Sequence, residues 1–70
     1  MGNIQEKFAL LREDISLQSD YIFELLFELG QASPGKARML AGILKEARAE
    51  LAELFRKETS MLRLQETNNV

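Results

Sequence analysis

Carboxylates are the side chains of this 70-residue chain that come closest to a chemical site. Glu46, Glu50 and Glu53 recur at a spacing that places them on adjacent turns of a helix. Two carboxyl groups act as acid and base only in a cleft that separates their pKa values. A helical rod offers no such cleft, so these carboxylates are interpreted as a solvated face. Glu24 and Glu28 lack the Glu-x-x-His motif of di-iron bundles, because the sequence contains no histidine.

Other reactive groups lack the partners that would activate them. With no His and no Cys, the chain has no imidazole base, no thiolate, no disulfide and none of the common zinc ligands. Its serines therefore have no base beside them. The segment Ser33-Pro34-Gly35-Lys36 lacks the pattern of a phosphate-binding loop and is better explained as a helix cap and turn. The sequence predicts a protein that is not an enzyme and holds no metal and no cofactor.

Charge is distributed unevenly along the chain. Residues 1–32 carry two basic and six acidic side chains, whereas residues 33–70 carry seven basic and five acidic ones. A broken basic stripe in the second half contains Arg38, Lys45, Arg48, Arg56 and Arg63. Nucleic-acid binding requires a dense positive footprint, and this stripe is interleaved with glutamates. A solvated, charge-balancing face is the favoured interpretation, and a nucleic-acid interface is the alternative.

Glycine and proline near the middle of the chain divide it into two helical halves. Gly30 is expected to end the first helix in a left-handed conformation, Ser33 to cap the second, and Pro34 to fit its first turn. The sequence predicts a single helical hairpin domain over residues 1–65, with a helix over about 3–30, a turn at 30–34, a helix over about 34–64 and a frayed tail at 66–70. Ser16 to Asp20 could instead break the first helix in two.

Apolar residues recur at alternating steps of four and three residues in both halves, as in a coiled-coil seam. The seam of the first half is Ile4, Phe8, Leu11, Ile15, Gln18, Ile22, Leu25 and Leu29. The seam of the second half is Ala37, Leu40, Leu44, Ala47, Leu51, Leu54, Glu58, Met61 and Gln65. Two amphipathic helices with a short connection pack antiparallel. The predicted fold class is therefore all-α, an antiparallel, coiled-coil-like two-helix hairpin.

Folding the chain about its turn predicts which residues face each other across the seam. Residues whose numbers add up to about 66 should be neighbours in the antiparallel pair. Expected apolar pairs are Ile22 with Leu44, Ile15 with Leu51 and Leu11 with Leu54, and Gln18 should lie opposite the small Ala47. The same register brings Glu28 near Arg38 and Lys7 near Glu58.

More large apolar side chains are present than two seams can bury. The sequence has 23 large apolar or aromatic residues between positions 4 and 64, and 12 of them belong to the two seams. The remaining 11 are Leu10, Leu17, Tyr21, Phe23, Leu26, Phe27, Met39, Ile43, Phe55, Leu62 and Leu64. Each is worth about 2 kcal/mol when fully buried. A second chain is expected to cover this surplus, most simply in a two-fold homodimer that forms a four-helix bundle.

Aromatic residues concentrate the surplus near the predicted turn. Phe23 and Phe27 are four residues apart and stack on one helical face, flanked by Tyr21 and Leu26. Tyr21, Phe23, Leu26, Phe27 and Phe55 are therefore the candidate partner-binding residues. Two interpretations remain open: the aromatic side chains are buried in the homodimer, or they dock a different protein, because aromatic residues dominate interface hot spots.

Neither a membrane span nor a secretory signal is expected, since the longest apolar cluster is short and the N-terminus lacks a basic start with an apolar run. A cytoplasmic, noncatalytic protein-binding module is predicted, one that homodimerises and regulates, inhibits or escorts a larger protein. The alternatives are a nucleic-acid-binding regulator and a subunit of an unequal helical complex. In shape alone the hairpin resembles small bacterial or phage helical hairpins, such as the plasmid copy-number regulator Rop, and acidic chaperones of secretion systems.

Overall fold

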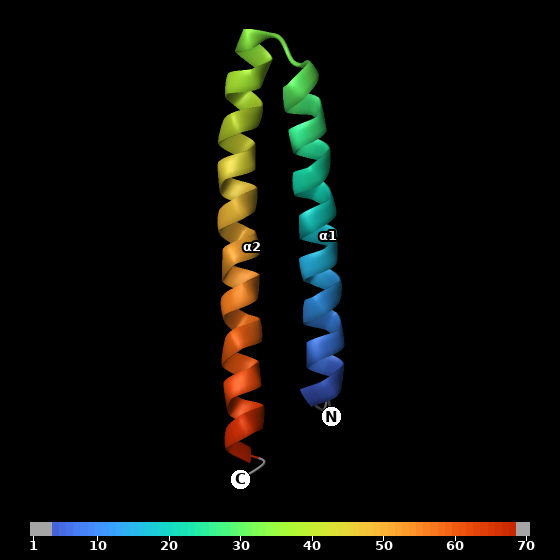
Figure 1. The fold of residues 1–70 in the computed structure, drawn as a ribbon, viewed down its shortest axis with the longest axis vertical. Helices are drawn as coiled ribbons and strands as arrows, with labels where there is room; N and C mark the ends of the chain where they lie inside the picture. The colour runs from blue at the N-terminus through green and yellow to red at the C-terminus, as the bar shows by residue number, and fades with distance from the viewer. Residues whose placement is uncertain (1–3, 69–70) are drawn as a thin grey trace.

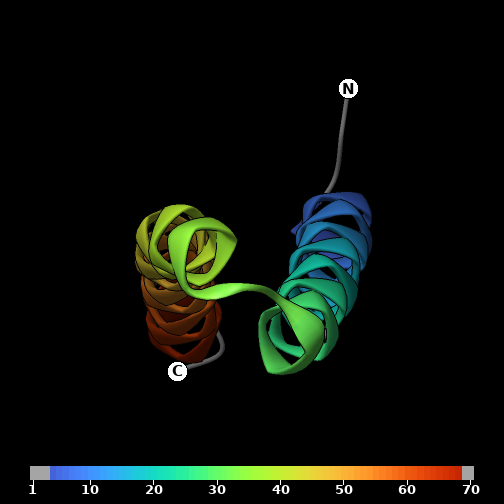
Figure 2. The same ribbon diagram turned by 90° about the horizontal axis from the view of Figure 1, so that it is seen from above.

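Two long helices form the whole of the described chain. The computed structural model describes residues 4–68, in which α1 (Ile4–Gln31, 28 residues) is followed by α2 (Pro34–Asn68, 35 residues). The helices lie side by side and run in opposite directions, with both free ends at the same end of a rod of 54 × 16 × 16 Å (Figure 1). Seen from above, the helices are inclined to each other (Figure 2), as packed helices with interlocking side chains are. The predicted all-α hairpin is confirmed.

The connection between the helices is tighter than the sequence suggested. Ala32 N–H donates to Leu29 O at 3.3 Å, and Ala37 N–H donates to Ser33 O at 2.8 Å. Ser33 therefore stands at the cap position of α2, and Pro34 is the first residue of that helix, as predicted. The expected left-handed Gly30 is wrong: within residues 4–68 no glycine has a positive φ. The bond from Ala32 back to Leu29 closes the turn instead, so Gly30 stays helical.

Both helices are continuous. Residues 16 to 20 are helical, so the possible break in the first helix does not form. α2 continues to Asn68, beyond the expected end near Leu64. Residues 66–68, which we expected to fray, extend that helix, whereas 69 and 70 lie outside the described residues. In the part of the chain that the structure describes, neither helix is long and apolar enough to cross a membrane.

The core consists of seam residues and is densest near the turn. Within residues 4–66 six side chains are buried, and every one is a predicted seam position: Leu11, Ile22, Leu25, Leu40, Leu44 and Ala47. Five of them form one cluster, from which Leu11 is separate, and Leu29, Ala32, Ile43 and Leu51 pack against it. Toward the open end, Glu58 and Gln65 occupy seam positions, which leaves that part of the seam less apolar.

A hydrogen bond fixes the register of the hairpin. Gln18 Nε2 donates to Ala47 O at 3.0 Å and to Glu50 Oε2 at 3.2 Å. The prediction that Gln18 lies opposite Ala47 is confirmed. The expected charge pairs contribute nothing to this register, since among the described residues neither Glu28 with Arg38 nor Lys7 with Glu58 forms an ion pair.

Replacing Gln18 by Leu should stabilise the hairpin. Leucine fills a similar volume beside the small Ala47 and adds apolar burial, whereas a polar seam residue secures register at a cost in stability. The free energy of unfolding should rise by about 1 kcal/mol, as measured by urea unfolding followed by circular dichroism. Gln18→Ala, which loses both the hydrogen bonds and the volume, is the control and should lower it. A lower stability for Gln18→Leu would show that the hydrogen bonds outweigh burial.

Candidate protein-interaction surface

The surplus of apolar side chains lies on the surface of the hairpin. Among the residues whose side chains the structure describes, ten large hydrophobic ones are exposed: Leu10, Leu17, Tyr21, Phe23, Leu26, Phe27, Met39, Phe55, Leu62 and Leu64. All ten belong to the 11 large apolar residues that lie outside the two predicted seams. The eleventh, Ile43, is half-buried because it packs against the core cluster. A single hairpin therefore exposes more large hydrophobic side chains than the six residues it buries.

Six of the eleven surplus side chains flank the seam, three on each of two opposite sides. Three of them, Leu26, Phe55 and Leu62, come directly after a seam residue that lies three positions after the previous one. Such positions lie on one side of the seam, which we name the Phe55 face. Tyr21, Ile43 and Leu64 each precede a seam residue and flank the opposite side, the Tyr21 face. A shallow groove on the Phe55 face is lined by Gln5, Phe8, Ala9, Arg12, Leu62 and Gln65.

The five predicted partner-binding residues do not form one patch. Phe23 and Phe27 are 77% and 68% exposed and line a small hollow with Glu24 and Glu28 on the outer surface of α1. Leu26 lies beside them on the Phe55 face, but Tyr21 lies on the opposite side of the seam. Phe55 is on α2, where it lines a separate hollow next to Arg56 and Arg63. The structure joins Phe23 and Phe27 and separates both from Phe55.

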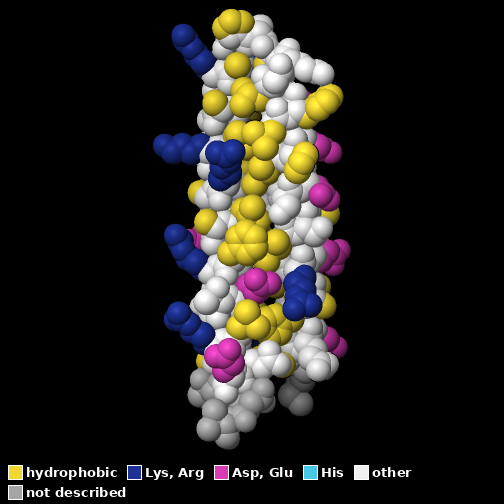
Figure 3. Space-filling model, viewed as in Figure 1, with side chains coloured by type: hydrophobic (Ala, Val, Ile, Leu, Met, Phe, Trp, Pro, Cys, Tyr) yellow, Lys and Arg dark blue, Asp and Glu magenta, His cyan; other side chains and the backbone are white. Residues whose placement is uncertain are grey.

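Charges are segregated between the outer edges of the two helices. The predicted basic residues Arg38, Lys45, Arg48, Arg56 and Arg63 are all exposed on α2. Figure 3 shows a hydrophobic band along the line between the helices, with basic side chains projecting from the outer edge of α2 and acidic ones from that of α1. Arg56 also pairs with Glu53 within α2. In this view the outer edge of α2 is mainly basic and that of α1 mainly acidic.

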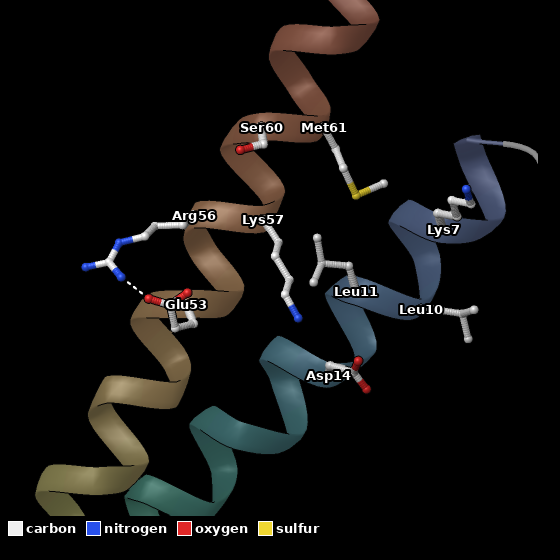
Figure 4. A pocket seen from close by; sticks show the side chains of 9 residues that line it. All are labelled: Lys7, Leu10, Leu11, Asp14, Glu53, Arg56, Lys57, Ser60 and Met61. Carbon is white, nitrogen blue, oxygen red and sulfur yellow. Dashed lines mark hydrogen bonds and ion pairs between the residues drawn. The ribbon is translucent and has the colours of Figure 1, made fainter.

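A hollow opens between the helices toward their free ends. Its volume is about 600 Å³, and it is lined by Lys7, Leu10, Leu11, Asp14, Glu53, Arg56, Lys57, Ser60 and Met61 (Figure 4). Leu11 and Met61 point into the gap between the helices, and the Arg56 guanidinium points away from it toward Glu53. Across residues 4–68, no group of three side chains is arranged to hold a metal ion. The hollow has an apolar floor, to which Leu11 and Met61 contribute, and charged residues on its rim.

Sequence reasoning left several exposed residues out of the candidate site. Leu62 and Leu64 were counted among the surplus residues but were not assigned to a surface. Leu62 follows a seam residue and so lies on the Phe55 face, whereas Leu64 precedes one and lies on the Tyr21 face. Asp14 and Lys57, which line the hollow near the free ends of the helices, were not singled out. Only the cross-helix register shows that these two residues are neighbours.

Comparison with known proteins adds no family to this description. No family model, no curated protein and no solved structure matches the chain. The function therefore has to be argued from the surface of the hairpin itself.

Proposed function

We propose that the protein is a noncatalytic, cytoplasmic protein-binding module that homodimerises and regulates, inhibits or escorts a larger protein. The observation that carries this proposal is the ten exposed large hydrophobic side chains on a hairpin that buries only six residues. Burying each such side chain fully is worth about 2 kcal/mol. Exposed apolar patches mark interaction sites in soluble proteins, and Phe23 with Phe27 forms one such patch.

The two apolar regions suit two different contacts. The Phe55 face runs along the seam and is suited to a second hairpin, because a four-helix bundle buries the side chains that flank each seam. Phe23 and Phe27 project from the outer surface of α1, away from α2, and form a compact aromatic patch with acidic neighbours. Aromatic residues are enriched among interface hot spots, so this patch is assigned to docking of the larger protein.

Replacing Phe23 and Phe27 together by Ser tests this division. The dimer should persist in sedimentation measurements, whereas capture of a target by the intact chain used as bait should be lost. The matched control is Leu10→Ser with Leu17→Ser, which removes two α1 side chains of similar exposure, 62% and 61%. That control should retain capture. Loss of the dimer with capture intact would assign the phenylalanines to assembly and contradict the division.

A nucleic-acid-binding regulator is the second candidate, favoured by the five exposed basic residues along one edge of α2. Glu46, Glu50 and Glu53 on the same helix dilute that positive charge, so the support is weaker. This function predicts binding that falls steeply with salt and weakens when Arg48 and Arg56 are replaced. Binding of a mixed RNA and DNA pool that does not change with salt would contradict it.

A subunit of an unequal complex is the third candidate, since exposed apolar faces can also be covered by a different chain. In that case the isolated protein should aggregate or be partly unfolded. Light scattering of the purified chain distinguishes the two situations, because a homodimeric module gives a single, well-folded species.

A further inference from the structure

A row of three carboxylates runs beside the two exposed phenylalanines of α1. Asp20, Glu24 and Glu28, which we name the acidic row, follow one another at steps of four residues, and all three are exposed. Phe23 and Phe27, which we name the aromatic patch, each precede a member of the acidic row by one residue and form a parallel row on the adjoining side of the helix. The two phenylalanines and the two glutamates line one hollow of about 330 Å³. The apolar surface and the negative charge therefore belong to one site.

The hairpin does not neutralise the acidic row. Residues 13–31 contain five acidic side chains and no basic one. Within residues 4–68, none of the three carboxylates of the acidic row forms an ion pair. The negative charge beside the aromatic patch is therefore open to a partner.

The acidic row costs the hairpin stability. Like charges four residues apart in a helix repel each other, and the row contains two such pairs. Glu28 also lies in the last turn of α1, which has no basic residue. A negative charge at the C-terminal end of a helix opposes the helix dipole. Charges that lower the stability of their own helix in this way are expected where a protein binds something else.

We infer that the aromatic patch docks a basic amphipathic helix of the larger protein, and that Lys and Arg side chains of that helix pair with the acidic row. This inference rests on the proposed docking function and specifies the chemistry of the partner. Carboxylates four residues apart on a helix are separated by about 6 Å along its axis. Lys or Arg residues three or four apart on a second helix have a similar separation, roughly 5–6 Å. Aliphatic side chains of that helix cover the phenylalanine rings, and its cations also gain from contact with the ring faces.

The same charges disfavour other occupants of the aromatic patch. Nucleic acids and anionic membrane surfaces carry negative charge, which the acidic row repels. A partner without cations would desolvate the neighbouring carboxylates and leave them unpaired, which costs free energy. A basic helix instead offsets the repulsion within the acidic row.

Peptide binding measures which charge the aromatic patch prefers. The probe is a peptide of about 15 residues that contains only Leu, Lys and Ala, with Leu along one side of a helix and Lys flanking it. Two matched peptides carry Gln or Glu in place of every Lys. Fluorescence anisotropy with the full chain should show that the Lys peptide binds about tenfold more tightly than the Gln peptide and that the Glu peptide does not bind. Added salt should reduce the advantage of the Lys peptide.

Neutralising the acidic row locates the charge that the peptide contacts. Glu24→Gln with Glu28→Gln should weaken binding of the Lys peptide about tenfold, because two exposed ion pairs are lost. The matched control is Glu46→Gln with Glu50→Gln, which removes the same charge at the same spacing and at the same heptad positions of α2. That control should change the affinity less than twofold. Equal weakening in the two variants would mean that only the total charge of the chain matters, which overturns the inference.

The same substitutions separate binding from folding. Gln and Glu have similar helix propensities. Glu24→Gln with Glu28→Gln should therefore raise the midpoint of urea unfolding, because the repulsion and the unfavourable contact with the helix dipole are removed. The expected variant is more stable and yet binds the Lys peptide less tightly. A lower midpoint would show that these carboxylates stabilise the hairpin, and would overturn the inference.

The outcomes distinguish this inference from the proposed function. Preference for the Lys peptide, with binding weakened at least thirtyfold by Phe23→Ser with Phe27→Ser, supports it. Equal binding of the Lys and Gln peptides that is lost in the phenylalanine variant overturns the basic partner and leaves the docking role of the aromatic patch standing. Binding of the Lys peptide that is unchanged in that variant overturns both.

Two further results would overturn the basic partner alone. One is that the Lys peptide does not bind at up to about 1 mM, although a target is captured through the aromatic patch. The other is that the chain by itself grows beyond a dimer and that Phe23→Ser with Phe27→Ser stops this growth. The aromatic patch would then bind a second copy of the chain.

Discussion

Replacing Leu44 by Ala is expected to unfold most of the protein at 25 °C. Leu44 is 7% exposed and belongs to the five-residue cluster at the turn end of the hairpin. Removing a buried leucine side chain costs about 2–5 kcal/mol. A core in a chain of this size supplies only about 3–5 kcal/mol of net stability. Helix content measured by circular dichroism should therefore fall sharply, and the urea midpoint should be lost or shifted far down.

The matched control for this variant is Leu17→Ala. It makes the same chemical change on the surface, where Leu17 is 61% exposed, and should alter stability by less than about 0.5 kcal/mol. Equal losses in the two variants would mean that Leu17 is buried in the assembled protein as deeply as Leu44. That result would contradict the assignment of the interface to the Phe55 face.

Replacing Phe55 and Leu62 together by Ser is expected to convert the proposed dimer into monomers at tens of micromolar. Both side chains lie on the Phe55 face and are about half-exposed in the single hairpin. Covering the remaining surface is worth about 1 kcal/mol for each side chain. The four side chains of a dimer then contribute about 4 kcal/mol, which corresponds to a dissociation constant raised about 10³-fold. Sedimentation equilibrium over a concentration series measures this change.

The control for the double variant is Leu17→Ser with Leu64→Ser, which removes two exposed leucines on the other side of the seam. The dimer should be retained, with a change in dissociation constant below about threefold. If both double variants dissociate equally, the interface covers both faces. If only the control dissociates, the Tyr21 face is the interface and the assignment made here is wrong.

Most of the fold could be predicted because hydrophobic periodicity determines it locally. The alternating steps of four and three residues placed every buried side chain on the seam, and Gln18 met Ala47 as the register required. Ser33 and Pro34 marked the start of α2, because cap chemistry acts over neighbouring residues. These features depend on a few adjacent residues or on the repeat of apolar residues along a helix. Both can be identified in a single sequence.

Other features depend on geometry that the sequence does not display. Gly30 permits a left-handed cap, but the backbone closed the turn with a bond from Ala32 to Leu29 instead. Glu28 and Arg38 were expected near each other, yet long exposed side chains gain little from such a pair and do not form it.

The candidate site was predicted only in part. Composition and spacing identified which apolar residues lie outside the seam. Tyr21 precedes one seam residue and Leu26 follows another, so spacing already places them on opposite sides of the seam, but it does not show that Phe55 lies apart from Phe23 and Phe27. That relation depends on how the two helices are set against each other.

Sedimentation equilibrium of the unmodified chain at high micromolar concentration tests the homodimer most directly. The exposed hydrophobic surface predicts a folded, soluble species of twice the 8.0 kDa chain mass. Dilution should lower both the mass and the helix content together. A compact, soluble monomer of 8.0 kDa at that concentration would contradict the homodimer, because the exposed side chains would then need no second chain to cover them.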